Sequence, residues 1–135
     1  NPQCVFFTAK LKNFFKLCLL LFKLFLKTLR MLIFNTTYLV ENEFYPQWIN
    51  WVQASLIPFM MSTADFSEPQ IAKVLTGESV KETSYSVQFK ISDKGKLNDW
   101  MQKHGEDFSQ LCTAKFGNHV LYFSTLLELI TDYDK

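Results

Sequence analysis

The chain has 135 residues, of which 48% are hydrophobic and 20% are charged, and this is typical of one globular domain with a short additional segment. The net charge of +1 hides an uneven distribution, because six of the 14 basic residues and no acidic residue lie in residues 1–30. Residues 31–135 therefore carry eight basic and 13 acidic residues, a net charge of −5. Binding to phosphate needs clustered Lys and Arg, so this acidic part of the chain argues against nucleic-acid binding.

The cysteines indicate the compartment. Cys4, Cys18 and Cys112 are odd in number and have no CxxC spacing, which argues against a disulfide framework and against a zinc site. We therefore expect a protein of the reducing cytoplasm.

Residues 1–30 form a basic, apolar segment. The longest uncharged apolar run, residues 17–22, has six residues, whereas a membrane-spanning helix needs about 20. Lys23 also interrupts the apolar region that a secretory signal would need. On a helical wheel the basic residues fall within roughly a 60° arc, which predicts an amphipathic helix that would lie in a membrane interface: Lys12, Lys16, Lys23, Lys27 and Arg30.

The change in composition falls at Met31, directly before a strand pattern. A misplaced start of translation would leave such a change at an internal methionine. We therefore expect residues 1–30 to be an extension outside the native domain and residues 31–135 to be the folded domain. The alternative is that the extension is expressed and makes peripheral contact with a membrane.

The first half of the domain begins with a strand and a helix. Residues 31–40 mix β-branched and aromatic residues without a charge, which is typical of a central strand. Residues 42–61 change to helical spacing, with Pro46 tolerable in the first turn and Pro58 expected to kink or end the helix.

The second half contains three further strands and one helix. Residues 69–76 and 84–91 read as a hairpin with a long loop, and the second of them alternates most cleanly. A helix capped by Ser92 or Asp93 follows and ends near Gly117, a plausible left-handed cap. Residues 119–130 form the last strand. The expected apolar face of this helix is Leu97, Trp100, Met101, His104, Phe108, Leu111 and Cys112.

The resulting order of elements, β-α-β-β-α-β, predicts a fold class. It is typical of the ferredoxin-like α+β sandwich, in which two helices cover one face of an antiparallel four-stranded sheet. In the present chain a basic amphipathic helix would precede this sandwich.

Residues 31 to about 130 also resemble a small bacterial family of domains of unknown function. The resemblance rests on NTTYLV after Met31, a Trp-rich helix leading to Ile57 and Pro58, SYSVQF at 84–89, and KFG with VLYFSTLLELI at 115–130. Family members often carry a His before the Ile-Pro pair and an acidic residue after it, where this chain has Leu56 and Phe59. The resemblance implies a ferredoxin-like fold similar to the dimeric α/β-barrel proteins, and it implies no activity.

The residues favour a protein that is not an enzyme. His104 lies on an expected apolar helix face, His119 lies at a strand entrance, and neither has carboxylates at metal-ligand spacing. Cys112 shares the apolar face and has no apparent base. Phosphate-binding and nucleophile motifs are absent from the sequence. We therefore expect no metal, no cofactor and no catalytic residue, and we expect the three tryptophans to be core residues.

The candidate site is the sheet face that the helices leave open. Alternation places Asn35 and Thr37 beside Ser86 and Gln88 on this face, because the first and third strands are central neighbours in the predicted sheet. The last strand adds either Tyr122 and Ser124 or Phe123 and Thr125, depending on its register. We take the first pair, which gives a polar candidate cavity face: Asn35, Thr37, Ser86, Gln88, Tyr122 and Ser124.

Three functional hypotheses follow. The first is a homodimer whose open faces pack together and bind a small molecule between them, or a protein partner. For the space between the two faces, the residues slightly favour a plain dimer interface without a ligand. The second is an enzyme of the cofactor-independent monooxygenase or isomerase kind, by analogy of fold alone. The third is a membrane-surface protein held by the basic helix.

Overall fold

The computed structural model describes residues 13–22, 31–75, 77 and 81–131, and it divides into two units, residues 1–30 and 31–135. Residues 13–22 of the first unit are helical, as expected. Four of the five residues of the predicted basic stripe, Lys12, Lys23, Lys27 and Arg30, lie outside the described residues. Among the helices that are described, none is both long enough and apolar enough to cross a membrane.

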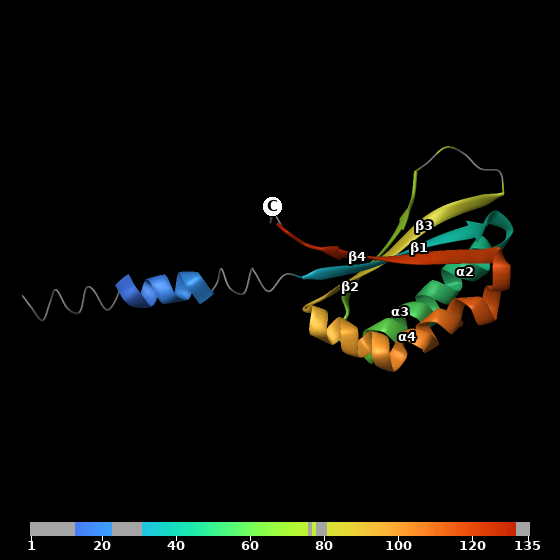
Figure 1. The fold of residues 1–135 in the computed structure, drawn as a ribbon. Helices are drawn as coiled ribbons and strands as arrows, with labels where there is room; N and C mark the ends of the chain where they lie inside the picture. Colours follow the sequence, from blue (N-terminus) through green and yellow to red (C-terminus); the bar gives the residue numbers. More distant parts are fainter. Residues whose placement is uncertain (1–12, 23–30, 76, 78–80, 132–135) are drawn as a thin grey trace, which may run out of the picture. The chain divides into compact units, whose positions relative to one another are not determined.

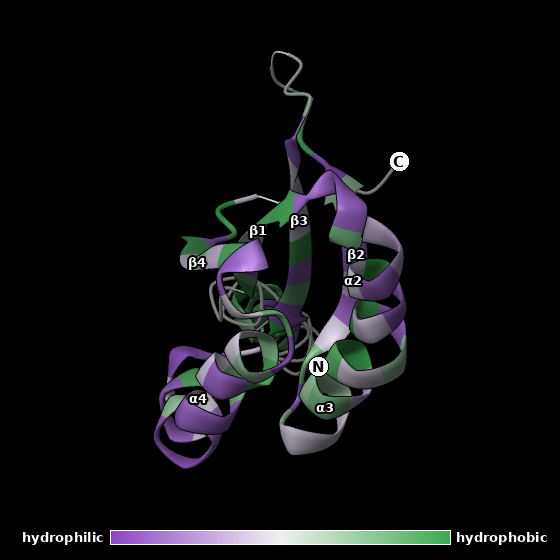
Figure 2. Ribbon diagram, turned by 90° about the vertical axis from the view of Figure 1, so that its right-hand side faces the viewer, coloured by the Kyte–Doolittle hydropathy of each residue, from purple (hydrophilic) through white to green (hydrophobic). Residues whose placement is uncertain are grey.

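The second unit is a ferredoxin-like α+β sandwich, as predicted (Figure 1). Its four strands form one antiparallel sheet in the order β2-β3-β1-β4, and the helices lie on one side of it (Figure 2). Short 3-10 turns follow β1 and α4. The elements are β1 (Leu32–Glu41), α2 (Tyr45–Trp51), α3 (Ile57–Thr63), β2 (Ser67–Lys73), β3 (Glu82–Ile91), α4 (Lys94–Phe116) and β4 (Val120–Glu128).

A π-helical turn, Val52–Leu56, joins α2 to α3 and accommodates Pro58. Proline lacks an N–H, and in an α-helix its ring would clash with the carbonyl four residues earlier. The wider turn, in which the N–H of Ile57 donates to the carbonyl of Val52, relieves this conflict. The helix therefore continues past Pro58 to Thr63 and does not end at the proline.

The edge strand β2 begins at Ser67, two residues before the expected start at Pro69. Its pairing with β3 is interrupted between Ser67 and Gln70, where Glu68 has a φ of 50°. A bulge at a sheet edge tolerates proline because no ladder hydrogen bond is needed there. The predicted strand, residues 69–76, therefore begins two residues late and ends three residues beyond Lys73.

The core lies between the sheet and the helices. Phe34 of β1 packs against Phe66, Trp100 and Phe108, and Tyr38 packs against Trp48 and Trp51. All three tryptophans are buried, which confirms their expected place. The largest fully buried side chains are Trp48, Trp100, Tyr38, Leu56, Met60, Ile91, Val40, Val52, Val87 and Cys112.

Helix α4 begins and ends near the predicted residues. The Asp93 carboxylate accepts a hydrogen bond from the backbone N–H of Lys96 at 2.8 Å. Gly117 ends the helix with a φ of 56°, in the range that favours glycine. Met101 is 49% exposed, so its predicted place on the buried face is wrong.

Candidate functional site

The polar residues of β1 and β3 lie opposite each other on the open face of the sheet. Asn35 pairs with Gln88, and Thr37 pairs with Ser86. Their sequence neighbours on β1 alternate with them and are buried under the helices, so these four residues point to the other side. All four are half-buried in the single chain. The structure thus brings together the central part of the predicted site.

Hydrogen bonds link these side chains in two neighbouring groups. The Ser86 hydroxyl donates to Asn35 Oδ1, and Asn35 Nδ2 donates to Thr37 Oγ1 at 3.4 Å. The Gln88 amide donates to Gln70 Oε1 on β2 at 2.7 Å. We name Asn35, Thr37, Gln70, Ser86 and Gln88 the polar cluster. Gln70 was missed from the sequence, although its alternation with Ile71 on an edge strand was a usable signal.

The predicted places of Tyr122 and Ser124 are wrong. Tyr122 pairs with the buried Tyr38, and its hydroxyl donates to the carbonyl of Ser109 on α4 at 2.8 Å. Ser124 pairs with Thr36, and the two hydroxyls share a hydrogen bond of 2.9 Å. Both residues therefore belong to the helix side of the sheet. The alternative register, which we did not choose, is the one observed.

Phe123 and Thr125 take their place on the open face, where they pair with Thr37 and Asn35. The apolar residues of β4 on this face are exposed: Leu121 by 53%, Phe123 by 63% and Leu127 by 45%. We name these three residues the apolar border. Together the polar cluster and the apolar border form one surface that contains no formal charge.

The charged residues of β1 and β3 on this face lie at its two ends, with Lys90 at one end and the paired Glu41 and Glu82 at the other. Lys90 pairs with Ser67 at the bulged end of β2, and its ammonium group contacts the Glu68 carboxylate at 2.7 Å. The positive charge is therefore balanced locally. The centre of the open face can be removed from water without leaving an unpaired formal charge, which would be costly.

Each of the two histidines packs against an aromatic ring. His104 packs edge-on against Phe59, with ring centroids 6.2 Å apart. His119 stacks on Phe44 at 4.1 Å and contacts the Glu41 carboxylate at 2.9 Å. Within the part of the chain that is described, no group of three or more His, Cys, Asp or Glu side chains could hold a metal ion.

Cys112 is buried beneath the sheet, as predicted. Burial raises the pKa of its thiol to about 12, and it also raises the pKa of the nearby Tyr38 hydroxyl. The reactive form of cysteine is the thiolate, which this environment disfavours. Cys112 therefore acts as a small core residue.

A separate open hollow lies between α3 and α4. The sheet separates this helical layer from the polar cluster, so the hollow is not part of the candidate site. Its lining consists of Phe59, Asp107, Gln110, Leu111, Ala114 and Lys115.

Comparison with known proteins identifies the fold and supplies no activity. A family model described as a domain of unknown function (DUF4286) matches residues 31–130, as the sequence resemblance indicated. No curated protein matches the sequence significantly.

Two solved structures are similar in fold. A Bacillus cereus protein provisionally named an antibiotic biosynthesis monooxygenase has 9% identity and a TM-score of 0.54, over 78% of this chain and 99% of that chain. A dimeric ferredoxin-like protein from an uncultured marine organism has 10% identity and a TM-score of 0.48, over 77% of this chain and 99% of that chain. At such identity the first likeness shows the fold alone.

Proposed function

The chain belongs to this family of domains of unknown function, and we propose that it is a homodimeric binding domain. In this proposal two copies pack their open faces together and enclose a small cavity lined by the polar cluster. The observation that carries the proposal is the composition of the open face, which has a neutral, internally hydrogen-bonded centre beside an exposed apolar border.

The apolar border supplies the driving force for this contact. Leu121, Phe123 and Leu127 are large side chains grouped on one strand, and such a patch on a single chain is typical of an interaction site. A face-to-face contact would remove about 800 Å² from each partner, the usual size of a specific interface. Rotational symmetry would bring the same residues of both copies together.

The polar cluster determines what the cavity would bind. The Gln88–Gln70 bond uses one polar group of each carboxamide, so the second group of each can contact a ligand. Because the cluster has no ionisable side chain, it suits a small neutral molecule with amide or hydroxyl groups better than an anion or a cation. A protein partner on the same face is the alternative occupant.

The other hypotheses have weaker support. A monooxygenase would be favoured if Asn35, Gln88 and Tyr122 converged on one cavity, but Tyr122 points to the helix side of the sheet. A cytoplasmic location stays a prediction. It is supported by the described cysteines, Cys18 and Cys112, which are both free thiols.

The dimer can be tested with one charge on the open face. Thr37→Glu would place like charges of the two copies close together in a region without counterions, so the face contact should be lost and the mass of the assembly halved. Gln102→Glu on the exposed surface of α4 is the matched control and should keep the wild-type mass. Sedimentation at several concentrations gives the masses. A wild-type monomer at high micromolar concentration, or an unchanged mass for Thr37→Glu, would refute the face contact.

The ligand can be tested separately from the dimer. In a thermal-shift screen of small neutral amides and alcohols, a true ligand should raise the melting temperature of the wild type. Gln88→Ala should abolish that shift and Gln110→Ala, on the exposed face of α4, should keep it. A shift that persists in Gln88→Ala would place the ligand elsewhere, even if the dimer itself is correct.

A further inference from the structure

The outer strand β4 has a free edge that is unusually well suited to pairing. It forms nine consecutive pairs with β1, from Leu32 with Glu128 to Val40 with Val120, without a bulge. Residues 120–127 contain no charged residue, proline or glycine. A long, regular and uncharged edge is a template for another strand.

The register shows which backbone groups face outward. The N–H of Leu129 donates to the carbonyl of Met31 at 2.9 Å, so this is a hydrogen-bonded pair of the β1–β4 ladder. Hydrogen-bonded and non-hydrogen-bonded pairs alternate along an antiparallel ladder. The backbone groups of Val120, Tyr122, Ser124 and Leu126 therefore point away from β1, toward the free edge.

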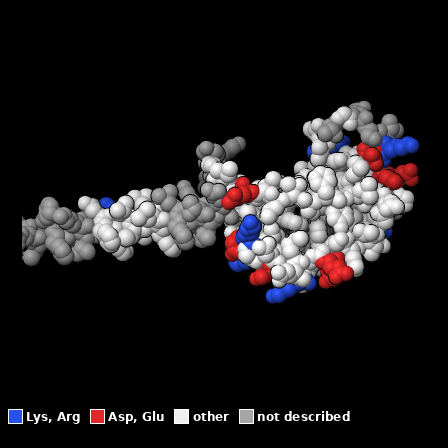
Figure 3. Space-filling model, in the orientation of Figure 1, with Lys and Arg blue, Asp and Glu red and all other residues white. Residues whose placement is uncertain are grey.

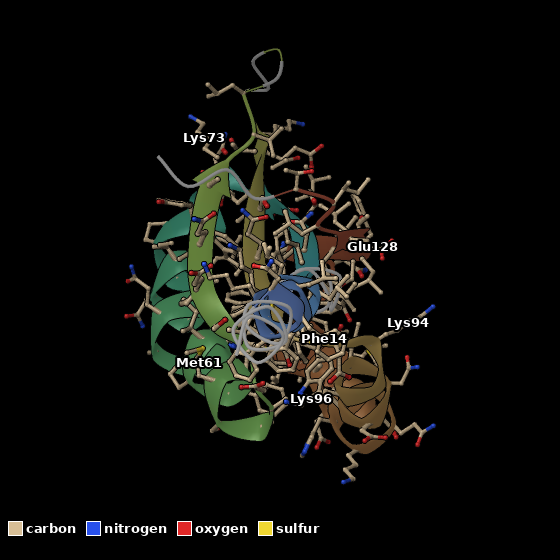
Figure 4. All side chains as sticks on the ribbon, turned by 90° about the vertical axis from the view of Figure 1, so that its left-hand side faces the viewer. Phe14, Met61, Lys73, Lys94, Lys96 and Glu128 are labelled. Atoms are coloured by element: carbon tan, nitrogen blue, oxygen red, sulfur yellow. The ribbon has the colours of Figure 1, made fainter. Side chains whose placement is uncertain are left out.

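The opposite edge of the same sheet is protected. β2 has a bulge with Glu68 at a φ of 50°, followed by Pro69, and it ends with Lys73. Bulges, prolines and lysines are the common devices that prevent strands from pairing at an edge. Figure 4 shows Lys73 and Glu128 at the two sides of the sheet. On β4 the acidic residue comes only at the end of the strand.

The side chains of β4 are exposed on both faces of the sheet. Phe123 is 63% exposed on the open face, and Leu126 is 44% exposed on the helix side, where Ser124 is exposed as well. Helix α4 therefore leaves this part of the edge accessible. In Figure 3 the band along β4 is free of Lys, Arg, Asp and Glu between its ends.

We propose that β4 pairs antiparallel with β4 of a second copy, around a twofold axis at Ser124. In this register Tyr122 lies opposite the partner's Leu126. The backbone N–H and C=O groups of both residues point toward the free edge, so they can form hydrogen bonds between the two copies. On the open face Leu121 meets the partner's Leu127, and Phe123 meets the partner's Thr125. The occupant of the edge is a second copy because the strand is complementary to itself in both backbone and side chains.

This edge contact is made by the outer backbone groups of β4, whereas the face contact of the proposed function is made by side chains of the open face, and only the apolar border takes part in both. The two contacts together would build an assembly of four copies. The edge contact would join two copies into one continuous sheet, and the face contact would pack two such sheets together. Each contact can therefore fail while the other stands.

The test uses full-length protein with Thr37→Glu as the background, in which the face contact is removed. We expect this variant to sediment as two subunits at high micromolar concentration. Adding Leu126→Pro removes an outward N–H, and we expect one subunit. Adding Leu126→Thr keeps the N–H and should leave two subunits. Leu126→Lys is a second edge variant that keeps the backbone intact and should also give one subunit.

The outcomes separate the two proposals. If Thr37→Glu is already a monomer, or if the edge variants remain dimeric while folded by circular dichroism, the edge contact is wrong. If Thr37→Glu keeps the wild-type mass, the face contact is wrong, and Leu126→Lys in the wild-type background then tests the edge by itself. If the β4 edge binds an added extended peptide while the protein does not associate with itself, the pairing with a second copy is also wrong.

Discussion

The indole N–H of Trp100 donates to the hydroxyl of Thr63 at 2.8 Å and joins α4 to the end of α3. Trp100 is only 2% exposed, and its ring contacts Phe34, Phe66 and Phe108. The sheet and two helices thus meet at one side chain. Both the hydrogen bond and the aromatic packing can be tested by substitution.

Replacing Trp100 by Ala should lower the free energy of unfolding by about 3–5 kcal/mol, because it leaves a cavity where three elements meet. Denaturant unfolding measures this difference. Such a loss is a large fraction of the stability of a small domain, so partial unfolding of the variant without denaturant counts as the same result. A loss below about 1 kcal/mol would contradict the buried position of the side chain.

Thr63→Val separates the hydrogen bond from the packing. The change leaves the buried indole N–H without its acceptor and should cost about 1–3 kcal/mol. The Thr63 hydroxyl itself donates to the carbonyl of Phe59 at 2.8 Å. Thr113→Val is the matched control, because the Thr113 hydroxyl likewise donates to a carbonyl, that of Ser109 at 3.1 Å, but on the exposed side of α4. Equal losses in the two variants, measured by the same denaturant titration, would show that the Trp100–Thr63 bond has no special role.

Cys112 should not react with thiol reagents in the native protein. Its pKa is raised to about 12, so at pH 8 the thiolate is much rarer than for an ordinary cysteine, and the side chain is also buried. We expect Cys112→Ala to leave the number of rapidly reacting thiols unchanged, whereas Cys18→Ala, at an exposed position, should lower it by one. A fast reaction lost in Cys112→Ala would contradict the core role.

Deleting residues 1–30 should leave the ferredoxin-like domain folded. The four strands, the helices α2 to α4 and the buried core all lie in residues 31–135. Circular dichroism and thermal melting of the shortened protein measure the effect. A loss of several degrees in melting temperature would show that the segment stabilises the domain and that the predicted boundary at Met31 is wrong.

The fold could be predicted from the sequence because local patterns and topology agree. Alternation in β1 and β3 places Phe34, Tyr38, Val87 and Phe89 on one face, and all four are buried. The strand and helix order then leaves few topologies. Pro58 was expected to kink or end the helix, and the structure places a π-helical turn directly before it, which lets the helix continue to Thr63.

The candidate site could be predicted only in part. Asn35, Thr37, Ser86 and Gln88 lie where alternation placed them, but β4 has large side chains at both odd and even positions, from Leu121 through Leu127. Its register is set by tertiary contacts, such as the bond from Tyr122 to Ser109, that sequence spacing does not contain. Because large apolar side chains occur at both odd and even positions, β4 is apolar on both faces of the sheet.

The most direct test of the central claim is hydroxyl-radical labelling of Phe123 over a range of protein concentrations. If two open faces pack together, labelling of Phe123 should fall as the concentration rises from nanomolar to high micromolar. Met101, which is exposed on α4, should stay equally labelled. In Thr37→Glu, where only the edge contact would remain, labelling of Phe123 should fall much less than in the wild type. Labelling of wild-type Phe123 that does not change with concentration, while sedimentation shows an oligomer, would contradict the face-to-face dimer.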